Sequence, residues 1–441
     1  MYRVVAKAYE GIGLHSQARD TWSSLRDRLL AKNTTEAFKY SHYYEFKEKQ
    51  LEFVSLKKSG NAIDPLFLCS IAPELRGGER KRILRSVGGW FRVEWTALGM
   101  RVYGMLPPIR VEFVEIKLGA RLFRRVRVKR FKRIFAYFHY HVRREVVAMM
   151  PVQSQLSIVS DRGWPVSFQG VDAARVTIPH GTGELLQSLE TDRIVDKKGF
   201  LVPTQAELVE KQQRYLAIYD QARAVFEHEI GTPLFLLYGT LLGYQRENDF
   251  IEGDDDFDVG YVCYENDANS VREKTKRLVV RLVLNGFNIS FNRSGRLFRL
   301  RRKEDPPGVH LDVRPVWFEG GHMWAHKHAH LPLRVEDFVP VKEGELRGMR
   351  VKVPGKAEKF LEAYYGSDWR VPDPDYVNVG KGIPKFVKRN LNMVCIRPSE
   401  YFEMVDQIEA QRSMYPNAGK LVATGLHPLY PLEEYNANCE W

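Results

Sequence analysis

The stretch FIEGDDDFDVGYV, residues 250–262, places four aspartates within five positions and continues as an apolar run. The four are Asp254, Asp255, Asp256 and Asp258. Like charges this close repel each other, so a folded chain keeps them together mainly when a cation compensates them. In a strand, alternate side chains point to opposite faces. Asp256 and Asp258 would then share one face, while the apolar residues between and after them enter a core.

A third carboxylate occurs in HLDVRP, residues 310–315. In a strand, His310, Asp312 and Arg314 would share the face opposite to the apolar residues. If this strand lies beside the first, Asp256, Asp258 and Asp312 converge. Three carboxylates suffice to hold one or two Mg²⁺ ions, or Mn²⁺, against a phosphate group. Asp254 and Asp255, at the entrance of the first strand, would support these ligands from behind.

Upstream of the acids, PLFLLYG (233–239) predicts a buried strand that ends at a glycine. Gly239 and Thr240 then lie at a strand-to-helix turn, where backbone N–H groups can approach a phosphate closely. The sequence therefore predicts a phosphate-binding turn next to the acidic strand.

Two other interpretations of the acids compete with a metal site on a sheet. An EF-hand loop would use Asp254, Asp256 and Asp258 with Glu265 at its twelfth position, but Val259 stands where the loop requires glycine. A solvated acidic loop is the second alternative, and the alternating apolar residues argue against it.

From residue 205 onward, predicted strands alternate with helices, which is typical of an α/β or α+β domain with a mixed sheet flanked by helices. We place a domain boundary near residue 200. The expected organisation is an N-terminal region over 1–200 that starts in a helical hairpin (2–33), a catalytic domain over 201–375, and a C-terminal extension over 376–441.

The exact residues of three segments indicate a family more specifically than the spacing of their acidic residues does. LYGTLLGYQRENDFIEGDDDFDVGYV (237–262) resembles the signature of the LicD and fukutin-type phosphotransferases, which have a nucleotidyltransferase fold. HLDVRP resembles the family's next acidic strand, and VPGKAEKFLEAYYGSDWRVP (353–372) resembles its closing segment. The resemblance covers about 205–375. Glu252-Gly253 and Tyr244-Gln245 depart from the family's pattern, which bears on donor preference more than on the metal site.

This resemblance implies transfer of a phospho-alcohol, such as phosphocholine or phosphoribitol, from a CDP-activated donor to a glycan hydroxyl, with loss of CMP. The expected context is modification of cell-envelope or surface polysaccharide, where the acceptor is often lipid-linked. Asp256 and Asp258 would hold Mg²⁺ on the diphosphate, and Asp312 would hold a second metal or accept the hydroxyl proton. Arg246 and the Gly239-Thr240 turn would bind phosphate oxygens. The alternatives are transfer of a nucleotide itself and a non-catalytic scaffold that binds polymer or membrane.

The positive charge is concentrated in one region. Residues 76–150 contain 19 Lys and Arg against 5 Asp and Glu, a local net charge of +14, whereas the whole chain carries +12. Apolar residues recur there mostly every fourth position, which predicts a helix over 118–146, although 123–129 alternates equally well as a strand. A solvated basic face over a core is one interpretation. Another is binding to an anionic membrane surface or polymer, with interleaved aromatic residues such as Tyr137 and Tyr140. RNA binding is less favoured, because no RNA-recognition signature accompanies the charge.

Four cysteines without metal-ligand spacing suit a reducing compartment. The first residues lack the apolar core of a secretory signal, and no stretch is apolar enough for a membrane span. We expect a cytoplasmic protein, peripheral on the inner face of a membrane. His322, His326, His328 and His330 could ligate zinc, but an exposed polar strand face is the favoured interpretation because cysteine partners are missing.

Overall fold

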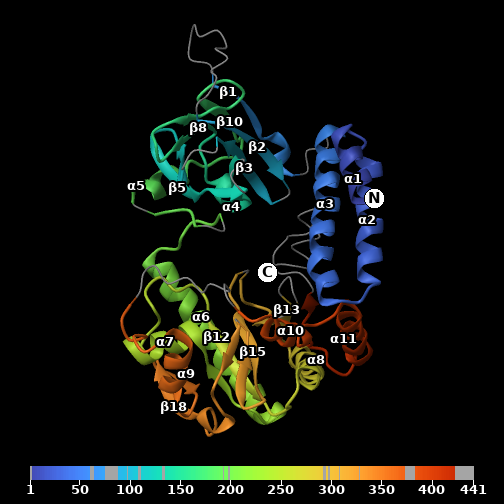
Figure 1. The fold of residues 1–441 in the computed structure, drawn as a ribbon, viewed down its shortest axis with the longest axis vertical. Coiled ribbons are helices and arrows are strands. Elements are labelled where there is room, and N and C mark those ends of the chain that lie inside the picture. The colour runs from blue at the N-terminus through green and yellow to red at the C-terminus, as the bar shows by residue number, and fades with distance from the viewer. Residues whose placement is uncertain are drawn as a thin grey trace.

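The fold comprises a helical hairpin, an antiparallel β module and a mixed α/β domain (Figure 1). The computed structural model describes residues 2–59, 64–74, 88–96, 98–107, 111–131, 135–191, 193–196, 199–291, 295, 298–306, 308–326, 328–372 and 383–422. In Figure 1 the β module lies above the α/β domain, and the hairpin runs along one side of both.

Helices α1 (Tyr2–Gly11), α2 (His15–Leu30) and α3 (Thr35–Ser59) form the hairpin region. The predicted hairpin over residues 2–33 is therefore present, and α3 adds a third helix. The Trp22 ring is buried and packs against Tyr43 and Tyr44 of α3. At its far end α3 reaches the β module, where the Phe53 ring lies 4.7 Å from that of Phe67.

The β module is built from two antiparallel sheets around one core. The six-stranded sheet has the order β1-β10-β8-β4-β5, with β9 beside β8, and the four-stranded sheet has the order β2-β3-β7-β6. The elements are η1 (Pro65–Leu68), β1 (Ser70–Pro73), β2 (Trp90–Thr96), β3 (Gly99–Leu106), β4 (Phe113–Leu118), β5 (Arg121–Arg127), β6 (Lys129–Phe131), β7 (Phe135–Arg143), α4 (Arg144–Ala148), β8 (Gln153–Ser160), β9 (Pro165–Val166), β10 (Ala173–Thr177) and α5 (Glu184–Glu190).

The helix predicted over residues 118–146 is wrong, and the strand alternative is correct. A spacing of four fits one face of a helix, but four is also a multiple of two and therefore fits one face of a strand. Ala136 and Tyr140, between the periodic positions of β7, are buried together with Phe138 and Val142, so the true period is two. Tyr140 is a core residue whose hydroxyl donates to the Asp196 carbonyl, so it is not part of a surface. Ile134, one of the apolar residues that recur every fourth position, lies outside the described residues.

The α/β domain begins with α6 (Gln205–Val225), whose first turn is closed by a capping box between Thr204 and Glu207. Its sheet has the order β11-β12-β15-β14-β13-β20, with β16 and β17 continuing from β15. The strands are β11 (Leu234–Leu236), β12 (Asp258–Cys263), β13 (Asn288–Phe291), β14 (Phe298–Arg301), β15 (Leu311–Glu319), β16 (His322–Ala325), β17 (Ala329–Leu331) and β20 (Leu421–Val422); a separate hairpin joins β18 (Lys342–Leu346) and β19 (Met349–Val353). The helical segments are η2 (Phe226–Ile230), α7 (Tyr238–Glu247), α8 (Ala268–Leu284), η3 (Val335–Asp337), α9 (Ala357–Tyr365), α10 (Lys385–Met393) and α11 (Pro398–Gln411).

The β12–β15 and β13–β20 pairs are parallel and the other pairs of this sheet are antiparallel, so the predicted mixed α+β class is confirmed. One apolar core extends from Tyr215 to Ala418 and includes side chains of α10 and α11. The described residues from 383 to 422 thus contribute to the same core as the strands that carry the acidic motifs.

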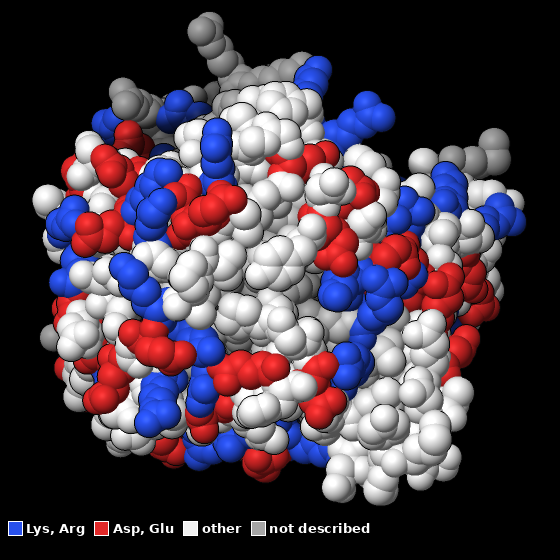
Figure 2. All heavy atoms as spheres, turned by 90° about the horizontal axis from the view of Figure 1, so that it is seen from below, with Lys and Arg blue, Asp and Glu red and all other residues white. Residues whose placement is uncertain are grey.

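On the face seen from below in Figure 1, Lys and Arg side chains are interspersed with Asp and Glu (Figure 2). No single-sign patch covers this face of the α/β domain. None of the helices in the described part of the chain has both the length and the apolar composition that crossing a bilayer requires.

Candidate functional site

Strands β12 and β15 bring two of the predicted carboxylates together. The strands are parallel, and Asp258 and Asp312 are direct register partners. Backbone hydrogen bonds hold this end of the sheet: Asp312 N donates to the Phe257 carbonyl at 2.9 Å, and Leu237 N donates to the Asp258 carbonyl at 3.0 Å. The convergence of the two acidic strands, expected from their patterns, is therefore present for this pair. Because β12 is a strand, the EF-hand alternative is excluded.

Strand β12 begins at Asp258, and Asp254 to Phe257 precede it as irregular backbone, so the prediction that Asp256 and Asp258 share one face of a strand is wrong. Helix α6 holds this acidic loop. Lys211 Nζ donates to the Asp255 carbonyl at 3.0 Å, and Gln212 Nε2 donates to the Asp254 carbonyl at 3.2 Å. The Tyr215 hydroxyl also donates to the Asp255 carbonyl. These three side chains lie on one face of α6, since they are spaced by one, three and four residues. A helix about 40 positions earlier in the chain thus fixes the backbone of the acids.

The Gly239-Thr240 turn lies directly beside this loop, at the start of α7. A Cβ atom at Gly239 would lie 3.4 Å from Asp254 Oδ2. The buried Thr240 hydroxyl accepts a hydrogen bond from Asp258 N at 2.8 Å, so the side chain anchors β12. No side chain of the described residues caps the N-terminus of α7. Its first N–H groups therefore remain suited to an anion.

Arg314 is a fully buried arginine between the two acidic strands. Its Nη1 lies 2.5 Å from Asp258 Oδ1, and its Nη2 lies 3.3 Å from Asp312 Oδ2. The guanidinium also sits over the Tyr238 ring, 5.2 Å from the centroid. Burial lowers the pKa of this group, and the two carboxylates raise it further than burial lowers it. Arg314 therefore stays charged and compensates part of the negative charge.

The remaining acids are crowded. Burial, and then the charges of Asp256 and Asp258, raise the pKa of Asp254 to about 8. The shift favours the protonated form of this carboxyl, which hydrogen-bonds to Asp256. Asp254 was expected to stand behind the ligands, but it lies in the carboxylate cluster itself.

The donor set suits a hard divalent cation. Buried oxygens of Asp254, Asp258 and Asp312 lack a hydrogen bond of normal geometry among the described residues. A cation would relieve both these oxygens and the repulsion that raises the pKa of Asp254. In the described part of the chain, no group of three or more His, Cys, Asp or Glu is arranged to hold a metal. The Arg314 guanidinium occupies the position beside Asp258 Oδ1 where a cation would bind. Metal binding would therefore require the side chains of Arg314 and the carboxylates to rearrange.

Arg299 and His310 form the more open rim of the site. Arg299 Nε lies 3.4 Å and His310 Nε2 lies 3.7 Å from Asp312 Oδ1, and all three side chains are partly exposed. Arg246, predicted to bind phosphate, lies at the other end of α7, about 9 Å along the helix from Thr240. Its guanidinium pairs with Glu247 at 2.6 Å. The described contacts thus place Arg299, and not Arg246, beside the carboxylates.

Sequence reasoning missed Lys211, Gln212, Tyr215 and Arg299 as parts of this site. The helix of the first three was recognised, but periodicity cannot tell which loop a helix will support. The alternation in HLDVRP predicts that Arg314 and Asp312 share a strand face, and this pattern was the available signal that Arg314 pairs with the carboxylates. The pattern could not predict that Arg314 would be fully buried beside the Tyr238 ring.

The histidine-rich segment forms no zinc site among the described residues. His322 and His330 stack across β16 and β17 with ring centroids 4.3 Å apart. Burial and the neighbouring His322 lower the pKa of His330. Trp324 of β16 is buried at 5% exposure and does not offer its face to a sugar.

Residues 231–356 match the sequence model of a known family, described as LicD/FKTN/FKRP, nucleotidyltransferase domain. This range contains the Gly239-Thr240 turn and both acidic strands. No curated protein matches the chain.

Proposed function

Residues 231–356 form a nucleotidyltransferase domain of the LicD family, a transferase domain of the LicD/FKTN kind, and on this premise we propose a specific reaction. The chain moves a phospho-alcohol from a CDP-activated donor to a hydroxyl of a glycan in cell-envelope or surface polysaccharide. The observation that supports this proposal best is the pairing of Asp258 with Asp312 beside the uncapped N-terminus of α7.

The two paired carboxylates differ in how far their side chains are exposed to solvent. The Asp258 side chain is 3% exposed, whereas that of Asp312 is 13% exposed and lies at the rim with Arg299 and His310. Of this strand pair, Asp312 is therefore the carboxylate that an acceptor hydroxyl can reach, and we assign it to receive the proton. Arg299 and the first N–H groups of α7 would bind donor phosphate oxygens.

In the proposed reaction the acceptor oxygen attacks the phosphorus that carries the alcohol. The bond from this phosphorus to the bridging oxygen breaks, and that oxygen leaves as part of CMP. The hydroxyl proton passes to Asp312. Positioning and charge compensation supply most of the catalysis in such transfers.

Asp256 and Asp258, with Asp254 beside them, would hold Mg²⁺ or Mn²⁺. When bound, the ion would neutralise charge on the diphosphate and on the departing CMP. The protein's own contribution is the loop held by α6, which keeps the three carboxylates at the end of β12.

CMP release from a panel of CDP-linked donors, with a glycan acceptor present, tests the proposal. Asp256→Asn and Asp258→Asn should each reduce the rate by about a thousandfold. Asp220→Asn, an exposed carboxylate on α6 that pairs with Arg223, is the matched control and should keep its rate. EDTA should abolish the release and Mg²⁺ restore it. Near-normal rates in both site variants would rule out the assignment.

Transfer of a nucleotide itself is the enzymatic alternative. Incorporation of label from a nucleoside triphosphate into product, without CMP release, would favour it. A scaffold without catalysis would show neither reaction and would leave the buried Asp258–Arg314–Asp312 arrangement without a chemical role.

A further inference from the structure

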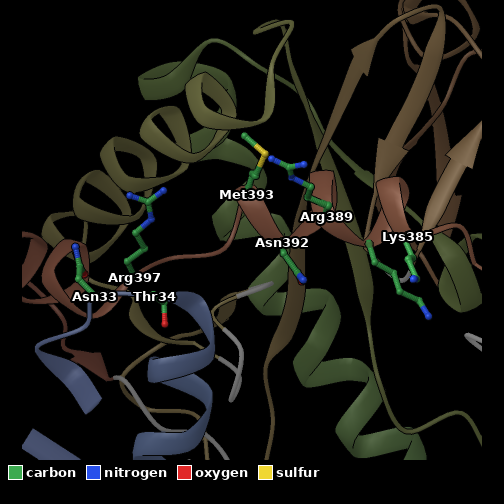
Figure 3. A pocket seen from close by; sticks show the side chains of 8 residues that line it. Asn33, Thr34, Lys385, Arg389, Asn392, Met393 and Arg397 are labelled. Atoms are coloured by element: carbon green, nitrogen blue, oxygen red, sulfur yellow. The ribbon is translucent and has the colours of Figure 1, made fainter. Parts of the chain in front are cut away.

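A cavity of about 510 Å³ lies where the hairpin region meets the end of the α/β domain, away from the carboxylates. Its walls are the turn between α2 and α3, helix α10 and the segment before α11 (Figure 3). Its lining includes four cations, Lys385, Lys388, Arg389 and Arg397, together with the polar side chains of Asn33 and Asn392. No acidic residue is among the described residues that line it. We refer to it as the α10 pocket.

The four cations are not compensated within the described residues. No salt bridge of Lys385, Lys388, Arg389 or Arg397 is found there, whereas most cations elsewhere in the α/β domain face a carboxylate. Positive charges that converge on one cavity repel each other, and an anion between them relieves this repulsion. Lys385, Lys388 and Arg389 share the pocket face of α10, and Figure 3 shows Arg389 and Arg397 reaching out from the two sides of Met393.

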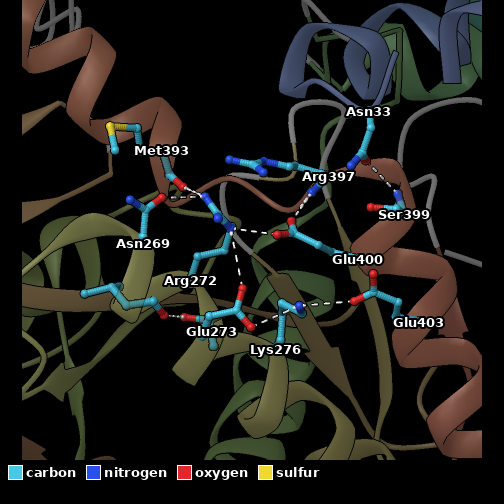
Figure 4. Close-up of polar contacts among 12 residues, drawn as sticks. Asn33, Asn269, Arg272, Glu273, Lys276, Met393, Arg397, Ser399, Glu400 and Glu403 are labelled. Carbon is cyan, nitrogen blue, oxygen red and sulfur yellow. Dashed lines mark hydrogen bonds and ion pairs between the residues drawn. The ribbon is translucent and has the colours of Figure 1, made fainter. Parts of the chain in front are cut away.

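Buried contacts hold the walls of the α10 pocket in place. Arg272 of α8 is 6% exposed and pairs with the equally buried Glu400 at 2.9 Å (Figure 4). Arg272 Nη1 also donates to the Met393 carbonyl, and Glu400 Oε2 accepts from Arg397 N at 2.7 Å. Both ends of the segment between α10 and α11 are thus fixed to α8. The cost of burying these charges is offset by hydrogen bonds that pre-form the cavity.

A polar contact of the hairpin region closes the pocket. Ser399 N donates to Asn33 Oδ1 at 3.0 Å, which joins the turn after α2 to the first turn of α11 (Figure 4). The cavity therefore exists only when the hairpin and the α/β domain are in contact. A ligand in the α10 pocket would touch both.

The pocket is separate from the catalytic carboxylates. Asn390 of α10 donates to Glu319 at 2.8 Å, and Glu319 is the last residue of β15. Asp312 lies seven residues earlier, which corresponds to about 23 Å along the strand. One phosphate group therefore cannot occupy both places.

We propose that the α10 pocket is a second anion-binding site, which holds a phosphate group on a remote part of the acceptor glycan. The choice of acceptor rests on the proposed function; the anion site itself does not. Lys and Arg suit phosphate oxygens, and Asn33 and Asn392 suit the hydroxyls of a sugar. A glycan bound here would be tethered about 20 Å from the reacting hydroxyl, which raises its effective concentration at the carboxylates.

Inorganic pyrophosphate is the probe for the site itself. It is titrated calorimetrically into the full chain at low ionic strength in metal-free buffer, where the crowded carboxylates repel anions. We expect one binding event per chain, weakened at least tenfold in Lys388→Gln/Arg389→Gln. The matched control is Lys342→Gln/Arg350→Gln, which removes two exposed cations of β18 and β19 and should bind as wild type. Absence of binding to wild type, or unchanged binding to the pocket variant, would overturn the proposal.

A kinetic comparison identifies the source of the phosphate. With a phosphate-containing glycan acceptor, the pocket variant should show at least a tenfold higher KM for the acceptor, while donor hydrolysis in the absence of acceptor stays unchanged. An unchanged KM alongside lost pyrophosphate binding would show that the acceptor does not use the pocket. Failure of the proposed function would appear differently, as no CMP release from wild type while pyrophosphate still binds.

Discussion

Arg314 links the two acidic strands with a side chain that is completely excluded from solvent. A buried cation between Asp258 and Asp312 lets the carboxylates approach each other without a metal, because its charge compensates part of theirs. The same contact limits how many oxygens a divalent ion could use. The site therefore contains its own counter-charge, and metal binding competes with it.

Replacing Arg314 by Met should destabilise the protein by about 3–5 kcal/mol, because two buried carboxylates lose their counter-charge. Urea unfolding followed by circular dichroism measures this. Arg347→Met, which removes a more exposed partner of Asp249, should cost less than about 1 kcal/mol. If Asp258→Leu/Arg314→Met proved as unstable as the sum of its single variants, the two residues would not be coupled.

Asp337 is another buried charged group that is compensated by opposite charges. Burial raises its pKa, but the Arg334 N–H and the ammonium groups of Lys359 and Lys356 lower it more, so the net shift is downward. A lowered pKa means that the carboxylate stabilises the fold above its unfolded pKa of about 3.9 and that this contribution fades as the pH falls below it.

Asp337→Asn should therefore lose about 1–2 kcal/mol of unfolding free energy at pH 7. The difference from wild type should stay constant between pH 8 and pH 5 and shrink below about pH 4. Urea titrations across this pH series provide the measurement. A difference that grew on acidification would contradict the sign of the shift.

At the scale of elements, the approach of α7 to the loop before β12 depends on one glycine. A Cβ atom at Gly243 would lie 2.7 Å from both the Asp249 carbonyl oxygen and Ile251 N, closer than real contacts allow. These are backbone atoms, which cannot move aside like the end of a side chain. The glycine of the GTLLG motif thus sets the path of the chain toward the acidic loop.

Gly243→Ala should cost about 1–3 kcal/mol of stability, because backbone must shift to admit the methyl group. It should also lower the rate of CMP release, since the shifted residues lead into Asp254. Gly11→Ala is the matched control: a Cβ there meets nothing within 4 Å. Thermal unfolding compares the two, and equal melting temperatures would contradict the packing argument.

At the scale of the whole molecule, the basic residues of 76–150 that the structure describes belong to the β module and not to one long surface helix. Arg125 and Arg127 are exposed on β5, and Lys129 and Arg130 are exposed on β6. Each Lys or Arg near an anionic membrane contributes about 1 kcal/mol of attraction. We therefore keep the membrane-surface proposal, with strands and not a helix as its carrier.

The full chain should cosediment with vesicles that contain anionic lipid but not with neutral ones, and about 0.5 M NaCl should release it. Changing Arg125, Arg127, Lys129 and Arg130 to Gln should abolish the binding without altering CMP release on a soluble acceptor. The control changes Arg277, Lys303, Lys342 and Arg350 to Gln, with the same loss of charge at exposed positions. Binding that resists salt, or that both variants lose equally, would argue against the β module as the anchor.

Local patterns in the chain determined which segments carry chemistry. The apolar run after Asp258 predicted the acidic strand, HLDVRP predicted its partner, and the GTLLG motif predicted the turn, because these signals are properties of neighbouring residues. The alternation around Phe257 was misleading, since Asp256 lies in the loop before the strand. The spacing of four in 118–146 could not separate helix from strand. The tertiary structure alone decided that Arg314 would be buried, that α6 would hold the acidic loop, and that Asn33 would meet α11. These contacts join residues up to 366 positions apart, and such pairings depend on the packing of whole elements, which no local pattern encodes.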